Sequence, residues 1–70
     1  MLIEHTKEYG IYHWDTFDNV TILVDEADTF VEAQEKVEER YKGRIDPIHG
    51  ADQVDIVNQN GDLLGIFKIE

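Results

Sequence analysis

The segment DPIHGAD contains the only residues in this sequence whose types and spacing resemble acid–base chemistry: Asp46, His49 and Asp52. A carboxylate that orients a histidine is a recurrent catalytic element, because the histidine can exchange a proton near neutral pH. Asp46 beside a proline is also a common turn former, and Asp52 lies where a loop would end. We therefore expect these residues to shape a loop, and we assign no catalytic residue.

Nucleophilic, phosphate-binding and metal chemistry have little support in the sequence. It has no serine and no cysteine, so threonine and tyrosine are the only hydroxyl nucleophiles. Its five glycines show neither the GxGxxG nor the GxxxxGK spacing of a phosphate-binding loop. His5 and His13 could meet across a first hairpin and bind a metal with a nearby carboxylate, but their spacing does not require it. The sequence therefore predicts no enzyme activity, no metal and no cofactor.

Charge is the strongest compositional signal. Sixteen acidic residues face six basic ones, for a formal net charge of −10. Affinity for nucleic acids and anionic lipids comes mainly from cationic side chains. The balance therefore argues against DNA, RNA and membrane surfaces as direct partners. No basic residue lies between Lys7 and Lys36, an interval that is rich in acidic ones.

Five acidic residues of this interval lie near the predicted ends of strands and are candidate partner-binding residues: Asp15, Asp18, Asp25, Glu26 and Asp28. In a simple hairpin the first two lie at the opposite end from the others. A six-residue strand is only about 20 Å long, however, so all five would contribute to one electrostatic field. Such a field would attract a basic protein surface and speed its docking. The alternative is that the acidity serves only solubility.

Strands that could position these residues are predicted in the first third of the chain. Residues 9–15 and 19–25 are rich in aromatic and β-branched residues and flank the polar turn DTFDN. They predict an antiparallel hairpin. Residues 2–6 predict a further, optional strand.

A helix is predicted from residue 29 or 30 to residue 42. Thr29 and Glu32 match a capping box, in which each side chain accepts a hydrogen bond from the other residue's backbone N–H. A predominantly apolar stripe then recurs at helical spacing: Phe30, Ala33, Gln34, Val37 and Tyr41. Gly43 follows at the position where a left-handed residue often ends a helix, and residues 43–53 are predicted as a loop.

A second hairpin is predicted over residues 54–70 around Asn60-Gly61. Two registers are open. A two-residue turn would pair Ile56 with Gly65, whereas a three-residue turn with a glycine bulge would shift the second strand by one residue. Either register places apolar side chains on both faces of the hairpin.

The face opposite the helix is the predicted apolar part of an interface. A single helix covers only one face of a sheet, and exposed apolar groups with a polar rim commonly mark interfaces. The residues concerned are Val57, Leu64 and Ile66. The N-terminal segment, a second copy of the chain or another protein could cover them.

These signals together predict one domain over residues 1–70 with an α+β fold. We expect a two-layer sandwich of four to five antiparallel strands, with one helix on one face and the order β(β)β-α-ββ. The sequence has no recognisable signal peptide or membrane span, so we expect a cytoplasmic protein.

The leading functional hypothesis is a non-enzymatic protein-interaction module that docks on a basic protein partner. Its sharpest form is a small phage or bacterial inhibitor whose acidic surface mimics nucleic acid. The alternative is a self-associating domain, a homodimer, whose acidity serves solubility.

Overall fold

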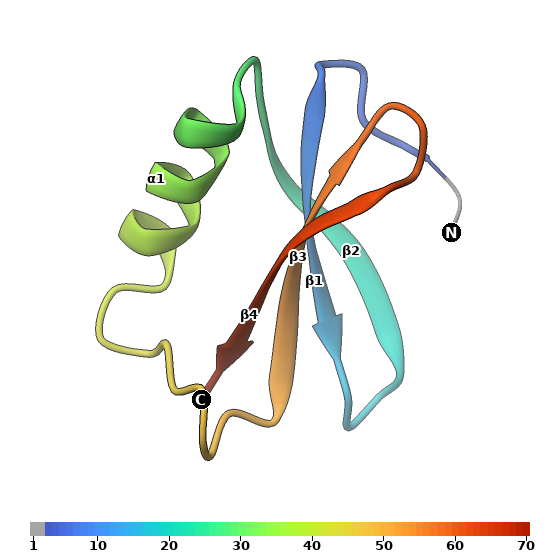
Figure 1. The fold of residues 1–70 in the computed structure, drawn as a ribbon. Coiled ribbons are helices and arrows are strands. Elements are labelled where there is room, and N and C mark those ends of the chain that lie inside the picture. The colour runs from blue at the N-terminus through green and yellow to red at the C-terminus, as the bar shows by residue number, and fades with distance from the viewer. Residues whose placement is uncertain (1–2) are drawn as a thin grey trace.

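Two antiparallel hairpins joined by one helix form the regular structure of residues 3–70, the part of the chain that the computed structural model describes (Figure 1). The elements are β1 (Tyr9–Asp15), β2 (Val20–Ala27), α1 (Phe30–Arg40), β3 (Asp52–Asn58) and β4 (Leu63–Ile69). The strand order in the sheet is β2-β1-β3-β4, and every neighbouring pair is antiparallel. The predicted α+β fold, with one helix on an antiparallel sheet, is confirmed.

The optional fifth strand over residues 2–6 does not form. Leu2 lies outside the described residues, and residues 3–6 are irregular. β1 has β2 on one side and β3 on the other, so it offers no free edge to the preceding segment. That segment crosses one face of the sheet instead.

The helix begins where the sequence predicts and ends two residues earlier. The backbone N–H of Glu32 donates a hydrogen bond to the Thr29 hydroxyl oxygen at 3.1 Å. Within residues 3–70 only this half of the capping box is present. The Glu32 carboxylate lies 3.4 Å from the ammonium of Lys36 instead. Tyr41 leaves helical geometry, and Gly43 follows with a φ of 78° in the left-handed region that glycine favours.

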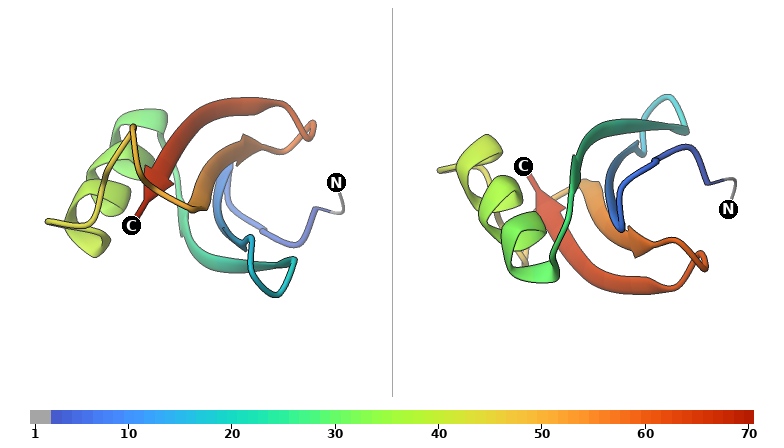
Figure 2. Two further views of the ribbon diagram at one scale, coloured as in Figure 1. Left: turned by 90° about the horizontal axis from the view of Figure 1, so that it is seen from below. Right: turned by 90° about the horizontal axis from the view of Figure 1, so that it is seen from above.

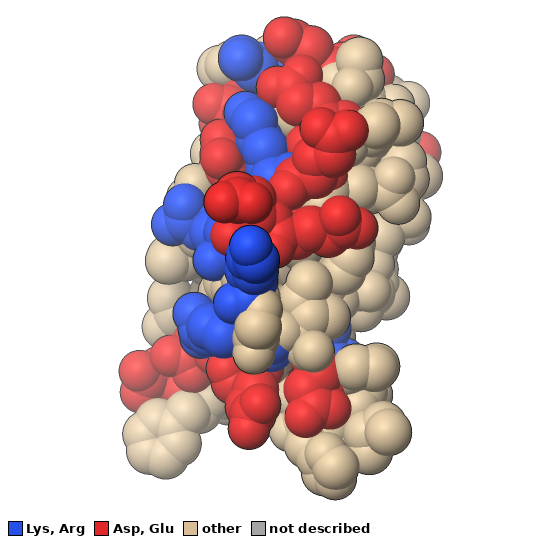
Figure 3. Space-filling view, turned by 90° about the vertical axis from the view of Figure 1, so that its left-hand side faces the viewer, with Lys and Arg blue, Asp and Glu red and all other residues tan. Residues whose placement is uncertain are grey.

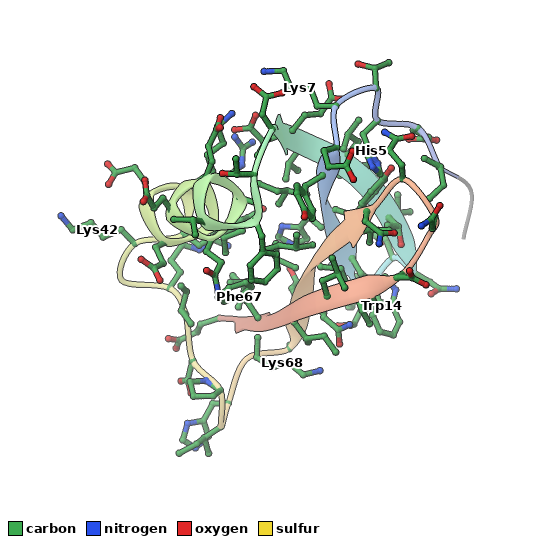
Figure 4. All side chains as sticks on the ribbon, turned by 45° about the horizontal axis from the view of Figure 1, so that its top comes forward. His5, Lys7, Trp14, Lys42, Phe67 and Lys68 are labelled. Carbon is green, nitrogen blue, oxygen red and sulfur yellow. The ribbon has the colours of Figure 1, made fainter. Side chains whose placement is uncertain are left out.

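The main core lies between α1 and one face of the sheet. Its buried members come from all four strands, from the helix and from the residue that follows it: Ile11, Ala27, Val54, Ile56, Ile69, Ala33, Val37 and Tyr41. Ile11 of β1 pairs with Ile56 of β3 and so joins the two hairpins at the centre of this core. Phe67 packs against it and lies between β4 and the helix (Figure 4).

Opposite the helix, the N-terminal segment (residues 3–8) lies over the second face of the sheet (Figure 2). The ring of His5 is buried against Gly10 and meets the ring of Tyr12 edge-on. The Tyr12 hydroxyl oxygen accepts hydrogen bonds from the backbone N–H groups of Glu4 (3.0 Å) and His5 (3.3 Å). Its own proton is therefore donated to His5 Nδ1, 2.7 Å away. The neutral ring then carries its proton on Nε2, which is buried without a partner in the described part of the chain.

Side chains, rather than strand pairing, fasten the N-terminal segment. The Glu26 carboxylate accepts hydrogen bonds from the backbone N–H groups of Thr6 and Lys7. The Gln59 amide donates to the carbonyl oxygens of His5 and Lys7. β2 and the turn after β3 thus hold the segment from both sides.

Replacing Glu26 with glutamine should weaken this attachment in a pH-dependent way. The N–H groups of Lys7 and Thr6 lower the pKa of Glu26 from its ordinary value of 4.5. A lowered folded-state pKa stabilises the fold above the ordinary value, and the contribution disappears as the pH falls through the folded-state pKa. Glu26→Gln should therefore lower the melting temperature at neutral pH, and the difference from the native protein should shrink below pH 4.5. Thermal unfolding followed by circular dichroism across this range measures it.

Glu38→Gln is the control for that experiment, because Glu38 is exposed on the helix. It should leave the melting temperature nearly unchanged at every pH. A Glu26→Gln difference that persisted or grew in acid would contradict the assigned hydrogen bonds.

The second hairpin combines the two registers that the sequence left open. Farther from the turn, Ile56 pairs with Gly65, which is the register of a two-residue turn. Nearer the turn Val57 pairs with Leu63, as a three-residue turn requires. A bulge at Leu64 absorbs the difference of one residue.

Candidate functional site

Asp15 and Asp18 lie at the turn between β1 and β2, at the lower end of the sheet in Figure 1. Asp15 Oδ1 accepts hydrogen bonds from the backbone N–H groups of Phe17 (2.9 Å) and Asp18 (3.3 Å), so this carboxylate shapes the turn. Asn19 completes the turn with a φ of 55°, a conformation that asparagine tolerates well. The exposed carboxylate of Asp18 makes no hydrogen bond or ion pair within the described residues.

The other three predicted acidic residues, Asp25, Glu26 and Asp28, lie at the opposite end of β2 beside two lysines. The ammonium of Lys36 is 3.4 Å from the Asp25 carboxylate, and that of Lys7 is 3.9 Å from Asp28. Glu26 is occupied in holding the N-terminal segment. The five acidic residues therefore form two groups. Only the group at the β1–β2 turn makes no ion pair with a lysine or arginine in the described chain.

Both acidic and basic side chains lie on the helix side of the molecule (Figure 3). Lys36 lies 3.4 Å from both Glu32 and Asp25. Partial burial by itself would lower the pKa of Lys36, but these two carboxylates outweigh it and raise the pKa above the ordinary 10.5. Basic side chains thus lie beside acidic ones on this side of the molecule, unlike at the β1–β2 turn.

Of the three apolar residues predicted to face a partner, one is buried and two are exposed. Val57 is 0% exposed, because it pairs with Gly10, on which the ring of His5 packs. Leu64 and Ile66 are 45% and 55% exposed on β4. The N-terminal segment thus covers the sheet around Val57 and not the outer strand β4. Val57 is removed from the predicted surface.

A further set of exposed apolar side chains lies on β2 and the adjoining turn. Val20 and Ile22 are each about half exposed, and Phe17 in the turn is 94% exposed. Val20 and Ile22 also line a groove of about 270 Å³. This β2 groove is formed by His13, Asp15, Asp18, Val20 and Ile22.

The exposure of this part of β2 follows from the short length of the helix. The alternation of Val20, Ile22 and Val24 is typical of a strand with one buried face. Only Val24 packs against the core. α1 has 11 residues, or about 16 Å, and covers only the upper part of the sheet (Figure 1). The lower half of β2 extends beyond it.

His13 connects the β2 groove to the core through two hydrogen bonds. Its Nε2 lies 3.0 Å from the Asp52 carboxylate and its Nδ1 lies 2.8 Å from the Tyr41 hydroxyl. The hydrogen bond with His13 lowers the pKa of Asp52 below its ordinary 3.8. Tyr41 is only 3% exposed, so its hydroxyl is not accessible to a substrate. The arrangement ties the end of α1 to β1 and β3, and the sequence does not indicate it because no local pattern joins these residues.

The loop predicted to hold Asp46, His49 and Asp52 brings only the first two together. His49 Nδ1 is 3.4 Å from the Asp46 carboxylate. Asp46 also accepts the backbone N–H groups of His49 and Ile48, and these two hydrogen bonds lower its pKa below 3.8. Asp52 turns toward His13 instead. Asp46 therefore forms a turn, as expected from its place beside the proline.

His5 and His13 do not meet. His5 contacts Tyr12, whereas His13 follows Tyr12 in β1 and points to the opposite face, toward Tyr41. Within residues 3–70 no group of three His, Asp or Glu side chains is placed to hold a metal ion. The helix that the structure describes is too short and too polar to cross a bilayer.

We compared the chain with models of protein families, with curated proteins and with solved structures. No model of a protein family, no curated protein and no solved structure matches the chain.

Proposed function

We propose that this protein is a non-enzymatic interaction module that docks on a basic protein surface through the β2 groove. The observation that carries the proposal is the combination found at the lower half of β2. Two half-exposed apolar side chains, Val20 and Ile22, adjoin the carboxylates of Asp15 and Asp18, and no lysine or arginine lines the groove. Apolar contact area would supply affinity, and the carboxylates would select a cationic partner.

The overall charge supports the same partner chemistry. A net charge of −10 on 70 residues produces a negative field that steers basic partners and repels acidic ones. The field acts from a distance, whereas the groove supplies the short-range contacts. The two effects differ experimentally, because salt screens the first more than the second.

An inhibitor that mimics nucleic acid is the more specific form of this proposal. It requires a larger acidic surface than the β2 groove provides. The mimicking surface would have to use both acidic groups of β2 at once. Asp25 and Asp28 would then have to exchange Lys36 and Lys7 for cations of the partner. The β2 groove alone makes no such demand, so docking through the groove is the form that the geometry supports best.

Charge reversal at the groove tests the proposal against a matched control. Asp15→Lys/Asp18→Lys changes the net charge by the same amount as Glu38→Lys/Glu39→Lys, whose side chains are exposed on the outer face of α1. Immobilised native protein should retain a partner from a lysate of its source at low salt and release it at high salt. The groove variant should lose roughly tenfold or more of that capture, and the helix variant should keep most of it. Equal losses would point to net charge alone, and capture unaffected by the groove variant would overturn the proposal.

Self-association is a second candidate, and the exposed side chains of Leu63, Leu64 and Ile66 on β4 favour it. Sedimentation equilibrium over a wide concentration range decides it. A strictly monomeric protein at high concentration would remove this candidate and leave the groove proposal intact.

A further inference from the structure

β2 is an outer strand of the sheet, and only its lower half is open for pairing. It has β1 as its single neighbour. At its upper end the ammonium of Lys36 donates to the backbone carbonyl of Glu26 at 2.6 Å and closes the edge there. Below that point a bulge at Val24 interrupts the regular pairing with β1, because Ile11 pairs with Asp25 and Tyr12 with Leu23. The regular stretch of open edge is therefore residues 20–23, beside the β2 groove.

The opposite edge of the sheet is better protected. On β4 the carbonyl of Lys68 accepts a hydrogen bond from the backbone N–H of Asp46 at 2.9 Å, and Ile69 forms a bridge with Ile45. The bulge at Leu64 distorts the rest of that edge. Lysine, proline, bulges and covering segments are the usual means of blocking strand addition. Residues 20–23 contain neither lysine nor proline.

A second copy of this chain is a poor occupant of the open edge. Each copy carries a net charge of −10, so pairing two copies along residues 20–23 would bring two strongly acidic surfaces together. A basic strand from another protein would instead be attracted by the same charge.

We propose that an extended, basic segment of the partner adds to β2 as a fifth strand along residues 20–23; this inference rests on the function proposed above. Strand side chains alternate between faces, so every second residue of the added strand would lie on the groove side. A lysine or arginine there packs its aliphatic stem on Val20 and Ile22 and brings its charge to Asp15 and Asp18. Apolar or β-branched residues on the other face lie beside Thr21 and Leu23.

A synthetic peptide in which lysine and valine alternate is the probe, used with the full chain labelled with ¹⁵N. Two control peptides accompany it: one with N-methyl groups on alternate backbone nitrogens, and one with glutamate in place of lysine. N-methylation removes the hydrogen-bond donors that strand pairing needs and leaves the charges unchanged. The unmodified peptide should shift the amide resonances of residues 20–23 and slow their hydrogen exchange. Its affinity should fall at least tenfold on N-methylation and on replacement of lysine by glutamate.

The outcomes separate this inference from the proposed function. Equal binding of the N-methylated peptide, or slowed exchange on β4 instead of β2, would overturn strand addition. No binding of the alternating peptide would also overturn it. In each of these cases the capture experiment decides the proposed function separately. If capture of the partner still depends on Asp15 and Asp18, the proposed function is supported even though strand addition is not.

Discussion

Replacing Ile56 with alanine is expected to lower the free energy of unfolding by about 2–5 kcal/mol, a typical cost of deleting most of a buried isoleucine side chain. Ile56 is 0% exposed at the centre of the core, where it pairs with Ile11. Small domains have total stabilities near the low end of roughly 5–15 kcal/mol, so this single change should leave a large unfolded fraction at physiological temperature. Urea unfolding followed by tryptophan fluorescence and circular dichroism measures the loss.

Ile66→Ala is the matched control, since it removes the same atoms from the neighbouring strand. Ile66 is 55% exposed, so its replacement should cost no more than about 0.5 kcal/mol. Similar losses for the two variants would contradict the assignment of the core. Stabilisation by Ile66→Ala together with loss of self-association would instead support a role for β4 in contacts between copies.

A methyl group at position 10 is expected to displace the N-terminal segment. A Cβ built on Gly10 would lie 2.5 Å from Cγ of the buried His5 ring, closer than real Cβ contacts allow. Gly10→Ala should therefore lower the free energy of unfolding by about 1–3 kcal/mol, the usual cost of overpacking. It should also speed hydrogen exchange at the amides of Thr6 and Lys7, whose hydrogen bonds to Glu26 depend on the position of the segment.

A double-mutant cycle with His5→Ala makes this prediction specific. His5→Ala empties the space next to Gly10 and loses the hydrogen bond with Tyr12. The added methyl group should then be harmless, so the double variant should be about as stable as His5→Ala alone. Additive losses would show that the cost of Gly10→Ala arises from the strand itself and not from the contact with His5. Gly65→Ala provides a background value, because the atoms nearest to its Cβ belong to Ile56 and lie at an ordinary 3.4 Å or more.

Elements of this fold that depend on local signals could be predicted from the sequence. Thr29 caps the helix because its hydroxyl satisfies a free backbone N–H three residues later. Asn60-Gly61 makes the second hairpin because the turn needs a residue that tolerates positive φ, and Gly61 adopts 84°. These preferences act within a few residues and survive in the folded protein.

Contacts between distant segments could not be predicted in the same way. The pairing of β1 with β3 brings His13 beside Asp52, although 39 residues separate them in the chain. The burial of Val57 depends on His5 crossing the second face of the sheet, and a polar residue near the start of the chain carries no apolar pattern that would indicate it. Strand periodicity likewise does not reveal how far a helix reaches, so the alternation of Val20, Ile22 and Val24 does not show that only Val24 packs against the core.

The bulge at Leu64 determines where this hairpin can change in length. Deleting Leu64 would leave Val57 paired with Leu63 and Ile56 paired with Gly65, because the two registers on either side already differ by one residue. A deletion elsewhere in β3 or β4 would move the buried side chains of one strand to the opposite face. Leu64 is thus a position in this hairpin at which one residue can be removed while the buried side chains keep their face of the sheet.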